Sequence, residues 1–162
     1  MNVIKNISNI NIYRNQLKYK RLLGIDFGTS RVGLAISDAL HISTAPLETL
    51  LYKKENFWGD LLAIIDKYNI GGIVVGIPIN EQKQGQETET YQKLIENLTN
   101  FIDKLHSKIS IPIFVQDESF SSKKAVNTMI EIGKKKKYRS TKGSTDKIAA
   151  AIILQDFINY FE

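Results

Sequence analysis

Carboxylate side chains attached to apolar segments are the residues of this chain best suited to chemistry. Asp26 ends the apolar run that begins at Arg21, and a Gly-Thr-Ser turn follows within two residues. Asp117 and Glu118 end the run "IPIFVQ", and Asp146 stands near the start of the last apolar segment. Because an ionised carboxylate is costly to bury alone, each of them needs a cation, a hydrogen-bond donor or a proton.

A divalent metal ion would meet the need of several carboxylates at once. Mg²⁺ and Mn²⁺ are hard ions that prefer carboxylate oxygens and water as ligands. Two such ions about 3.5–4 Å apart can activate a water and stabilise the leaving oxygen in phosphodiester hydrolysis. The plainer interpretation of each residue is a turn or a helix cap, where Asp is also favoured. Whether the three segments meet depends on the fold.

The stretch "GIDFGT" around Asp26 has a second interpretation, as the ATP-binding turn of actin-like and sugar-kinase-like ATPases. Such ATPases resemble two domains of this kind closing on a nucleotide, and they carry a second Asp-x-Gly phosphate motif. No other Asp of this chain is followed two residues later by Gly. The chain also lacks a GxxxxGK[ST] loop, which excludes a P-loop NTPase.

Positive charge is concentrated in two segments of the chain, whose formal net charge is +5. Residues 1–21 hold five basic residues and no acidic one, and the loop 133–142 adds six more. These six are Lys134, Lys135, Lys136, Lys137, Arg139 and Lys142. Clustered cations attract polyanions, nucleic acids above all, although a lysine run can also be only a solvated loop. We expect the six residues of the loop to bind nucleic acid.

Composition narrows the class of protein further. With 162 residues the chain is expected to form one domain with a substantial core. It contains no cysteine, which excludes disulfides and thiolate metal sites and fits a reducing cytoplasm. No apolar run approaches the ~18 residues of a membrane span, and the N-terminus lacks the apolar block of a secretory signal. We therefore expect a cytoplasmic protein without a membrane partner.

The elements that position Asp26 are predicted to be two strands, 21–27 and 32–38, joined by a glycine turn. In the second strand bulky residues alternate with Gly33, Ala35 and Ser37. Asp26 shares its face of the first strand with Gly24. One side of this hairpin is therefore unusually bare, and it leaves room for something to lie there.

The rest of the chain predicts an α/β protein with a mixed sheet and helices on its faces. A third strand over 46–52 and a helix over 55–68 precede the apolar strand 71–78, which is typical of a sheet buried on both faces. A polar loop, a helix ending near residue 105 and a fifth strand over 111–117 follow. A short helix over 121–132 and a final helix that Ser144 caps complete the chain.

Asp146 shares one face of the final helix with apolar residues. At about 100° per residue, Ala150, Ile153, Phe157 and Tyr160 lie within roughly 40° of the direction of Asp146. This spacing centres the carboxylate on the face that is expected to pack inward.

Four motifs of the chain, in order, resemble the YqgF/RuvX family of small RuvC-like proteins. They are "LLGIDFGTSRVGLAISD" (22–38), "VVGIPIN" (74–80), "DES" (117–119) and "DKIAAAIILQDFI" (146–158). The resemblance implies one ribonuclease H-like nuclease domain over residues 21–162, preceded by a basic N-terminal extension, 1–20, that we expect to be loosely packed. It implies a five-stranded mixed sheet in which three antiparallel strands come first and parallel strands follow, flanked by helices.

The resemblance also implies a function and a site. The function is that of a metal-dependent nuclease that matures the 5′ end of pre-16S ribosomal RNA during ribosome biogenesis. The acidic positions of the family fall on Asp26, Glu118 and Asp146, which the fold brings together to hold Mg²⁺ or Mn²⁺. Lys123 and Lys124 are further candidates for holding the phosphate backbone of the substrate.

Two alternatives stay open beside the rRNA nuclease. One is a Holliday-junction resolvase acting on four-way DNA, as likeness to RuvC suggests. The other is an RNA- or ribosome-binding module without activity, because this chain has Ser119 where the family has Arg. A serine hydroxyl does not replace the bidentate guanidinium as a partner of phosphate or carboxylate. The expected partner is precursor rRNA or a DNA junction, bound by a monomer or a homodimer.

Overall fold

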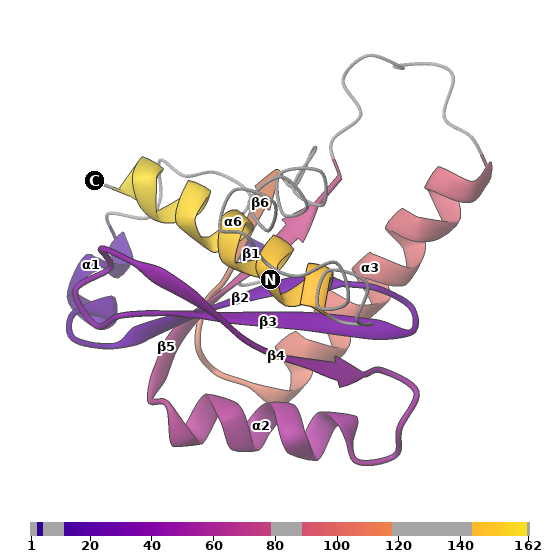
Figure 1. Ribbon diagram of the computed structural model, residues 1–162, viewed down its shortest axis with the longest axis horizontal. Coiled ribbons are helices and arrows are strands. Elements are labelled where there is room, and N and C mark those ends of the chain that lie inside the picture. Colours follow the sequence, from indigo (N-terminus) through magenta and orange to yellow (C-terminus); the bar gives the residue numbers. More distant parts are fainter. Residues whose placement is uncertain (1–2, 5–11, 79–88, 118–143, 162) are drawn as a thin grey trace.

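The computed structural model describes residues 3–4, 12–78, 89–117 and 144–161, and its strands form one mixed sheet (Figure 1). The strands are β1 (Val3–Ile4), β2 (Arg21–Phe27), β3 (Arg31–Ser37), β4 (Thr44–Leu51), β5 (Ile70–Ile77) and β6 (Ile113–Asp117). Their order across the sheet is β1-β6-β5-β2-β3-β4. Strands β2, β3 and β4 pair antiparallel, whereas β5 and β6 join β2 in parallel. The predicted arrangement of five strands is confirmed, and the two-residue β1 adds a sixth.

Helices cover both faces of the sheet, as the order of elements predicted. They are α1 (Arg14–Leu17), α2 (Phe57–Lys67), α3 (Glu89–Lys108) and α6 (Ser144–Phe161). Figure 1 shows α2 on one side of the sheet and α6 on the other. The predicted helix over 121–132 lies outside the described residues. No helix of the described part of the chain is long and apolar enough to cross a membrane.

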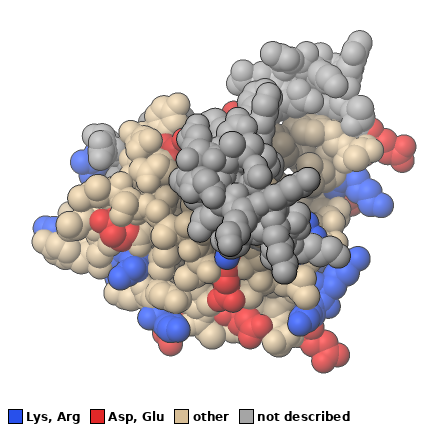
Figure 2. Space-filling view, in the orientation of Figure 1, with Lys and Arg blue, Asp and Glu red and all other residues tan. Residues whose placement is uncertain are grey.

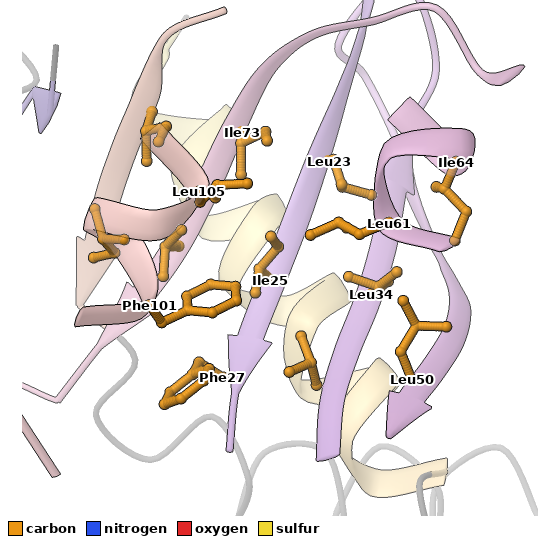
Figure 3. Packing of buried hydrophobic residues seen from close by; sticks show 14 of the residues in the cluster. Leu23, Ile25, Phe27, Leu34, Leu50, Leu61, Ile64, Ile73, Phe101 and Leu105 are labelled. Carbon is orange, nitrogen blue, oxygen red and sulfur yellow. The ribbon is translucent and has the colours of Figure 1, made fainter. Parts of the chain in front are cut away.

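The larger core lies between the sheet and the pair α2 and α3. Every second residue of β2 contributes to it, and Figure 3 shows Leu23, Ile25 and Phe27 beside Leu61 of α2 and Phe101 of α3. The rings of Phe27 and Phe101 stack with centroids 4.6 Å apart. Burial of each such side chain contributes about 1.5–3 kcal/mol, so this layer holds the meander and the parallel strands together.

The bare face of the hairpin is filled by α6. A Cβ atom at Gly33 would lie 2.2 Å from the carbonyl oxygen of Asp146, and one at Gly24 would lie 2.8 Å from that of Ala150. The absence of side chains at both glycines therefore lets the helix backbone approach the sheet. The buried residues of α6 surround much of its axis, and they are Ser144, Ile148, Ala149, Ala150, Ala151, Ile153, Leu154, Phe157 and Ile158. The expectation for Tyr160 is wrong, because this ring near the helix end is 67% exposed.

The described residues 12–20 of the N-terminal extension pack on the domain more closely than a loose extension would. Leu17 of α1 is fully buried in the same apolar cluster as Phe114 and Phe157. The Cδ2 of Leu17 lies 3.1 Å from the position that a Cβ on Gly72 would take. The glycine in β5 therefore leaves room for the leucine side chain. Tyr13 meets Phe114 edge to face, with ring centroids 5.7 Å apart. These contacts cover the part of the sheet that α6 leaves open.

Candidate active site

Asp26 lies near the carboxyl end of β2 and faces α6. Its partner on β3 is Gly33, and side chains of directly paired residues point to the same face of a sheet. The register of the parallel strands continues this row through Gly76 of β5 to Gln116 of β6, since Ile25, Val75 and Val115 are aligned. Gln116 is almost fully buried. The row thus holds two polar side chains, with a glycine between them.

Asp146 reaches the same end of the same face from α6. It belongs to the first turn of the helix, and its carbonyl oxygen lies directly over Gly33, the residue paired with Asp26. Two of the three predicted site residues therefore converge, although they are far apart in the sequence. Their carboxylate oxygens are the ligands that hard divalent cations prefer, so the donor set fits such an ion.

Arg31 joins this pair of carboxylates from the first position of β3. Its Nε donates a hydrogen bond to Oδ2 of Asp146 at 2.9 Å, and the side chains are 40% and 25% exposed. Arg31 is not among the site residues predicted from the sequence. Its position could have identified it as a site residue. Arg31 follows the glycine turn, five residues beyond Asp26, and a hairpin brings such a residue back to the same end of the sheet.

The third predicted carboxylate, Glu118, lies outside the described residues. Its neighbour Asp117 ends β6 and pairs with Ile77 of β5. Within the described ranges, no group of three or more His, Cys, Asp or Glu could hold a metal ion. The other predicted residues outside those ranges are Ser119, Lys123, Lys124, Lys134, Lys135, Lys136, Lys137, Arg139 and Lys142.

The carboxylate of Asp38, just after the end of β3, has a structural role in the loop that follows. Its Oδ1 accepts hydrogen bonds from the backbone N–H of Ile42 at 2.7 Å and of Ser43 at 3.2 Å. Burial tends to raise the pKa of Asp38, but these N–H donors outweigh it, and the pKa lies below its usual value. The Nε2–H of the nearby His41 donates a hydrogen bond to the carbonyl oxygen of Lys20 at 2.7 Å. Both residues hold the loop between β3 and β4.

A family model described as "RuvX: Holliday junction resolvase" matches residues 20–160 of this chain. A protein of Rickettsia typhi described as "Putative pre-16S rRNA nuclease" is 34% identical over 97% of this chain and 95% of its own length. A protein of Orientia tsutsugamushi with the same description is 37% identical over 84% of this chain and 82% of its own. The matches span almost the whole domain.

Among solved structures, the chain is similar to T. thermophilus RuvC in complex with a Holliday junction substrate. The TM-score is 0.51 at 12% identity, and the match covers 85% of this chain and 93% of RuvC. The yeast mitochondrial Holliday junction resolvase Ydc2 matches with a TM-score of 0.50 at 10% identity, covering 93% of this chain and 85% of Ydc2. At these identities the likeness shows the fold, which is the ribonuclease H-like fold predicted from the motifs.

Proposed function

This chain belongs to the RuvX family, and we propose that it is a cytoplasmic nuclease that hydrolyses phosphodiester bonds in precursor 16S ribosomal RNA. The resemblance inferred from its four motifs is confirmed by the family match. The choice of precursor rRNA as substrate rests on the description that its relatives carry. Membership in a nuclease family makes a nucleic acid the substrate class.

The observation that carries the proposal is the convergence of Asp26 and Asp146 on the α6 face of the sheet. We propose that these two side chains and Glu118 hold Mg²⁺ or Mn²⁺. Support for Glu118 comes from chain connectivity, because it follows Asp117 at the carboxyl end of β6, with Cα atoms about 3.8 Å apart. This is also the end of the sheet at which β2 carries Asp26.

A divalent cation bound there would supply water activation and stabilisation of the leaving oxygen in phosphodiester hydrolysis. Arg31 holds Oδ2 of Asp146, and among the described residues no hydrogen bond to Oδ1 is seen, which suits binding of that ion. The remaining N–H groups of the guanidinium suit a substrate phosphate, which an arginine fork binds well. Arg31 could thus provide the guanidinium that Ser119 does not. The basic residues of segment 133–142 would hold the phosphate backbone.

The test of this function is cleavage of a precursor rRNA fragment by the wild-type protein and by Asp26→Asn. We expect metal-dependent cleavage by the wild type and none by Asp26→Asn, because the amide loses the charge that binds the cation. Circular dichroism would check that the variant folds. Asp66→Asn, a matched change on the exposed surface of α2, should cleave like the wild type. Unchanged cleavage by Asp26→Asn would refute these roles.

The family description favours a second candidate, resolution of Holliday junctions. A four-way DNA junction assayed beside the RNA, each with Mg²⁺, Mn²⁺ or a chelator, separates the two substrates. Cleavage of the junction alone would replace the rRNA proposal. Binding of RNA without products under any condition would instead indicate a module that has kept the fold without the activity.

A further inference from the structure

A groove with a volume of about 550 Å³ lies beside the turn that follows Asp26, on the side of the sheet covered by α2 and α3. Lys53 and Lys54 contribute to its lining from the segment between β4 and α2, and Lys104 contributes from α3. All three side chains are exposed. Three ammonium groups from two separate elements therefore surround one groove.

Helix α3 presents a polar stripe to this groove. Lys93, Asn97, Asn100 and Lys104 follow one another at spacings of three and four residues, and so share one face of the helix. The acidic residues of this stretch, Glu96 and Asp103, are exposed and point roughly 70–90° away from the stripe. Figure 2 shows Lys and Arg side chains along the right-hand edge of the molecule, with Asp or Glu side chains at the upper and lower ends of that edge.

The groove continues along α3 toward the proposed catalytic end of the sheet. A second hollow of about 540 Å³ shares Thr29 and Asn97 with the first and includes Lys93. Thr29 belongs to the turn between β2 and β3, three residues after Asp26. At about 3.8 Å per residue, the Cα atoms of Thr29 and Asp26 lie within ~11 Å of each other. Three lysines line the first hollow. The second hollow is lined by Lys93 and by Glu89, the first residue of α3.

The aromatic part of the lining is rigid. Trp58 stacks on Phe101 at 5.6 Å between centroids and meets Phe57 edge to face at 5.1 Å. Tyr52 meets the same Phe57 ring at 5.0 Å. Tyr52 and Trp58 are half-buried and line the groove, so each ring is anchored in the core and leaves part of its surface accessible.

We propose that this groove binds the sugar–phosphate backbone of one nucleic-acid strand next to the cleaved bond, an inference that rests on the proposed function. Lysine ammonium groups neutralise phosphates, and the amides of Asn97 and Asn100 hydrogen-bond to phosphate or sugar oxygens. A charged groove with aromatic side chains is the arrangement that binds single strands without regard to sequence. The strand passes from Asp26 around the β2–β3 turn onto α3.

The test uses the full chain in a chelating buffer, where binding is measured without cleavage. The probes are single-stranded RNA and DNA oligonucleotides of the same sequence. Trp58 is the only tryptophan of the protein, so its fluorescence reports directly on the groove. We expect saturating oligonucleotide to change this fluorescence. A response to both probes indicates recognition of the shared backbone, and a response to RNA alone indicates additional contacts to the 2′-hydroxyl groups.

Paired variants then identify the cations involved. Lys53→Gln/Lys104→Gln should lower the slope of log affinity against log salt by about 1.4, at ~0.7 for each phosphate contact on a single strand. Arg21→Gln/Lys67→Gln removes the same charge at the opposite end of the sheet, where β2 and β5 begin, and should keep the wild-type slope. Circular dichroism would confirm that both variants fold.

Binding without a change in Trp58 fluorescence, or equal salt slopes for the two variants, would refute the proposal that this groove binds nucleic acid. Neither result would contradict the proposed function, which is tested separately by metal-dependent cleavage and by the Asp26 variant. Conversely, a wild-type Trp58 response with no cleavage under any metal would leave the groove in place and refute the nuclease.

Discussion

Arg31 contacts a proposed catalytic carboxylate directly, that of Asp146. Its 2.9 Å hydrogen bond orients Asp146 while both side chains remain partly exposed. Ion pairs with this exposure contribute only about 0–1 kcal/mol to stability, because water screens the charges. The role of Arg31 is therefore expected to appear in activity rather than in folding.

We expect Arg31→Gln to lower the rate of RNA cleavage about tenfold or more. A tenfold loss corresponds to about 1.4 kcal/mol, which is the lower range for one hydrogen bond to a charged group. Urea unfolding should show a change of less than ~1 kcal/mol in the free energy of unfolding. A variant that cleaves as fast as the wild type would show that orientation of Asp146 by Arg31 does not limit the reaction.

At the scale of elements, the contact between α6 and the hairpin sets the position of Asp146. The missing side chains of Gly24 and Gly33 allow this contact, because Cβ atoms there would lie only 2.8 Å and 2.2 Å from carbonyl oxygens of α6. The strand pattern of small residues is thus a packing surface for a helix that carries a carboxylate. The same contact brings Asp146 to the face that Asp26 occupies.

Gly33→Ala should therefore displace the start of α6. The added methyl group would meet the carbonyl group of Asp146, and overpacking of this kind costs about 1–3 kcal/mol. We expect a lower free energy of unfolding in urea together with a loss of cleavage in the folded fraction.

Gly59→Ala is the matched control, since among the described residues nothing beyond its chain neighbours and the backbone of α2 itself lies within 4 Å of the added Cβ. Alanine in a helix should stabilise the protein by about 0.5–1 kcal/mol and leave cleavage unchanged. Equal stability and activity for Gly33→Ala and Gly59→Ala would contradict the packing argument.

On the scale of the whole molecule, the N-terminal segment is part of the described fold. Leu17 of α1 joins residues from five other elements in one apolar cluster, and β1 pairs with β6 at the edge of the sheet. The α6 face of the sheet is therefore covered by the two ends of the chain together. In the proposed function, cleavage depends on this face, because Asp26 lies on it and Asp146 of α6 packs over it.

Leu17→Ala should lower the free energy of unfolding by about 2–5 kcal/mol, as a truncated and fully buried leucine leaves a cavity. Thermal or urea unfolding measures this loss. Ile12→Ala, in the same segment but 76% exposed, should change stability by less than ~0.5 kcal/mol. Similar small effects for both variants would show that the segment is not part of the cooperative fold.

Much of the architecture was predictable from the sequence, because it depends on local patterns. Alternation of bulky and small residues predicted β2 and β3, the apolar run over 71–78 predicted the doubly covered strand β5, and a serine expected to cap the last helix predicted the start of α6. The four motifs sufficed for the family, since three of them join a strand or a helix to a carboxylate at a specific position and the other is the apolar strand that ends at Pro78.

The tertiary structure decided which residues meet. Spacing along the chain does not predict that Asp146 lies over Gly33, the partner of Asp26. Nor does it predict that Arg31 bonds to Asp146 or that Leu17 is buried. Tyr160 was misplaced for the same reason, as the helix face that packs inward ends where the sheet ends. The lysines of the groove come from two elements that only the packing of α3 beside the β4–α2 turn brings together. Local patterns are properties of neighbouring residues, whereas a site joins distant residues through the packing of whole elements.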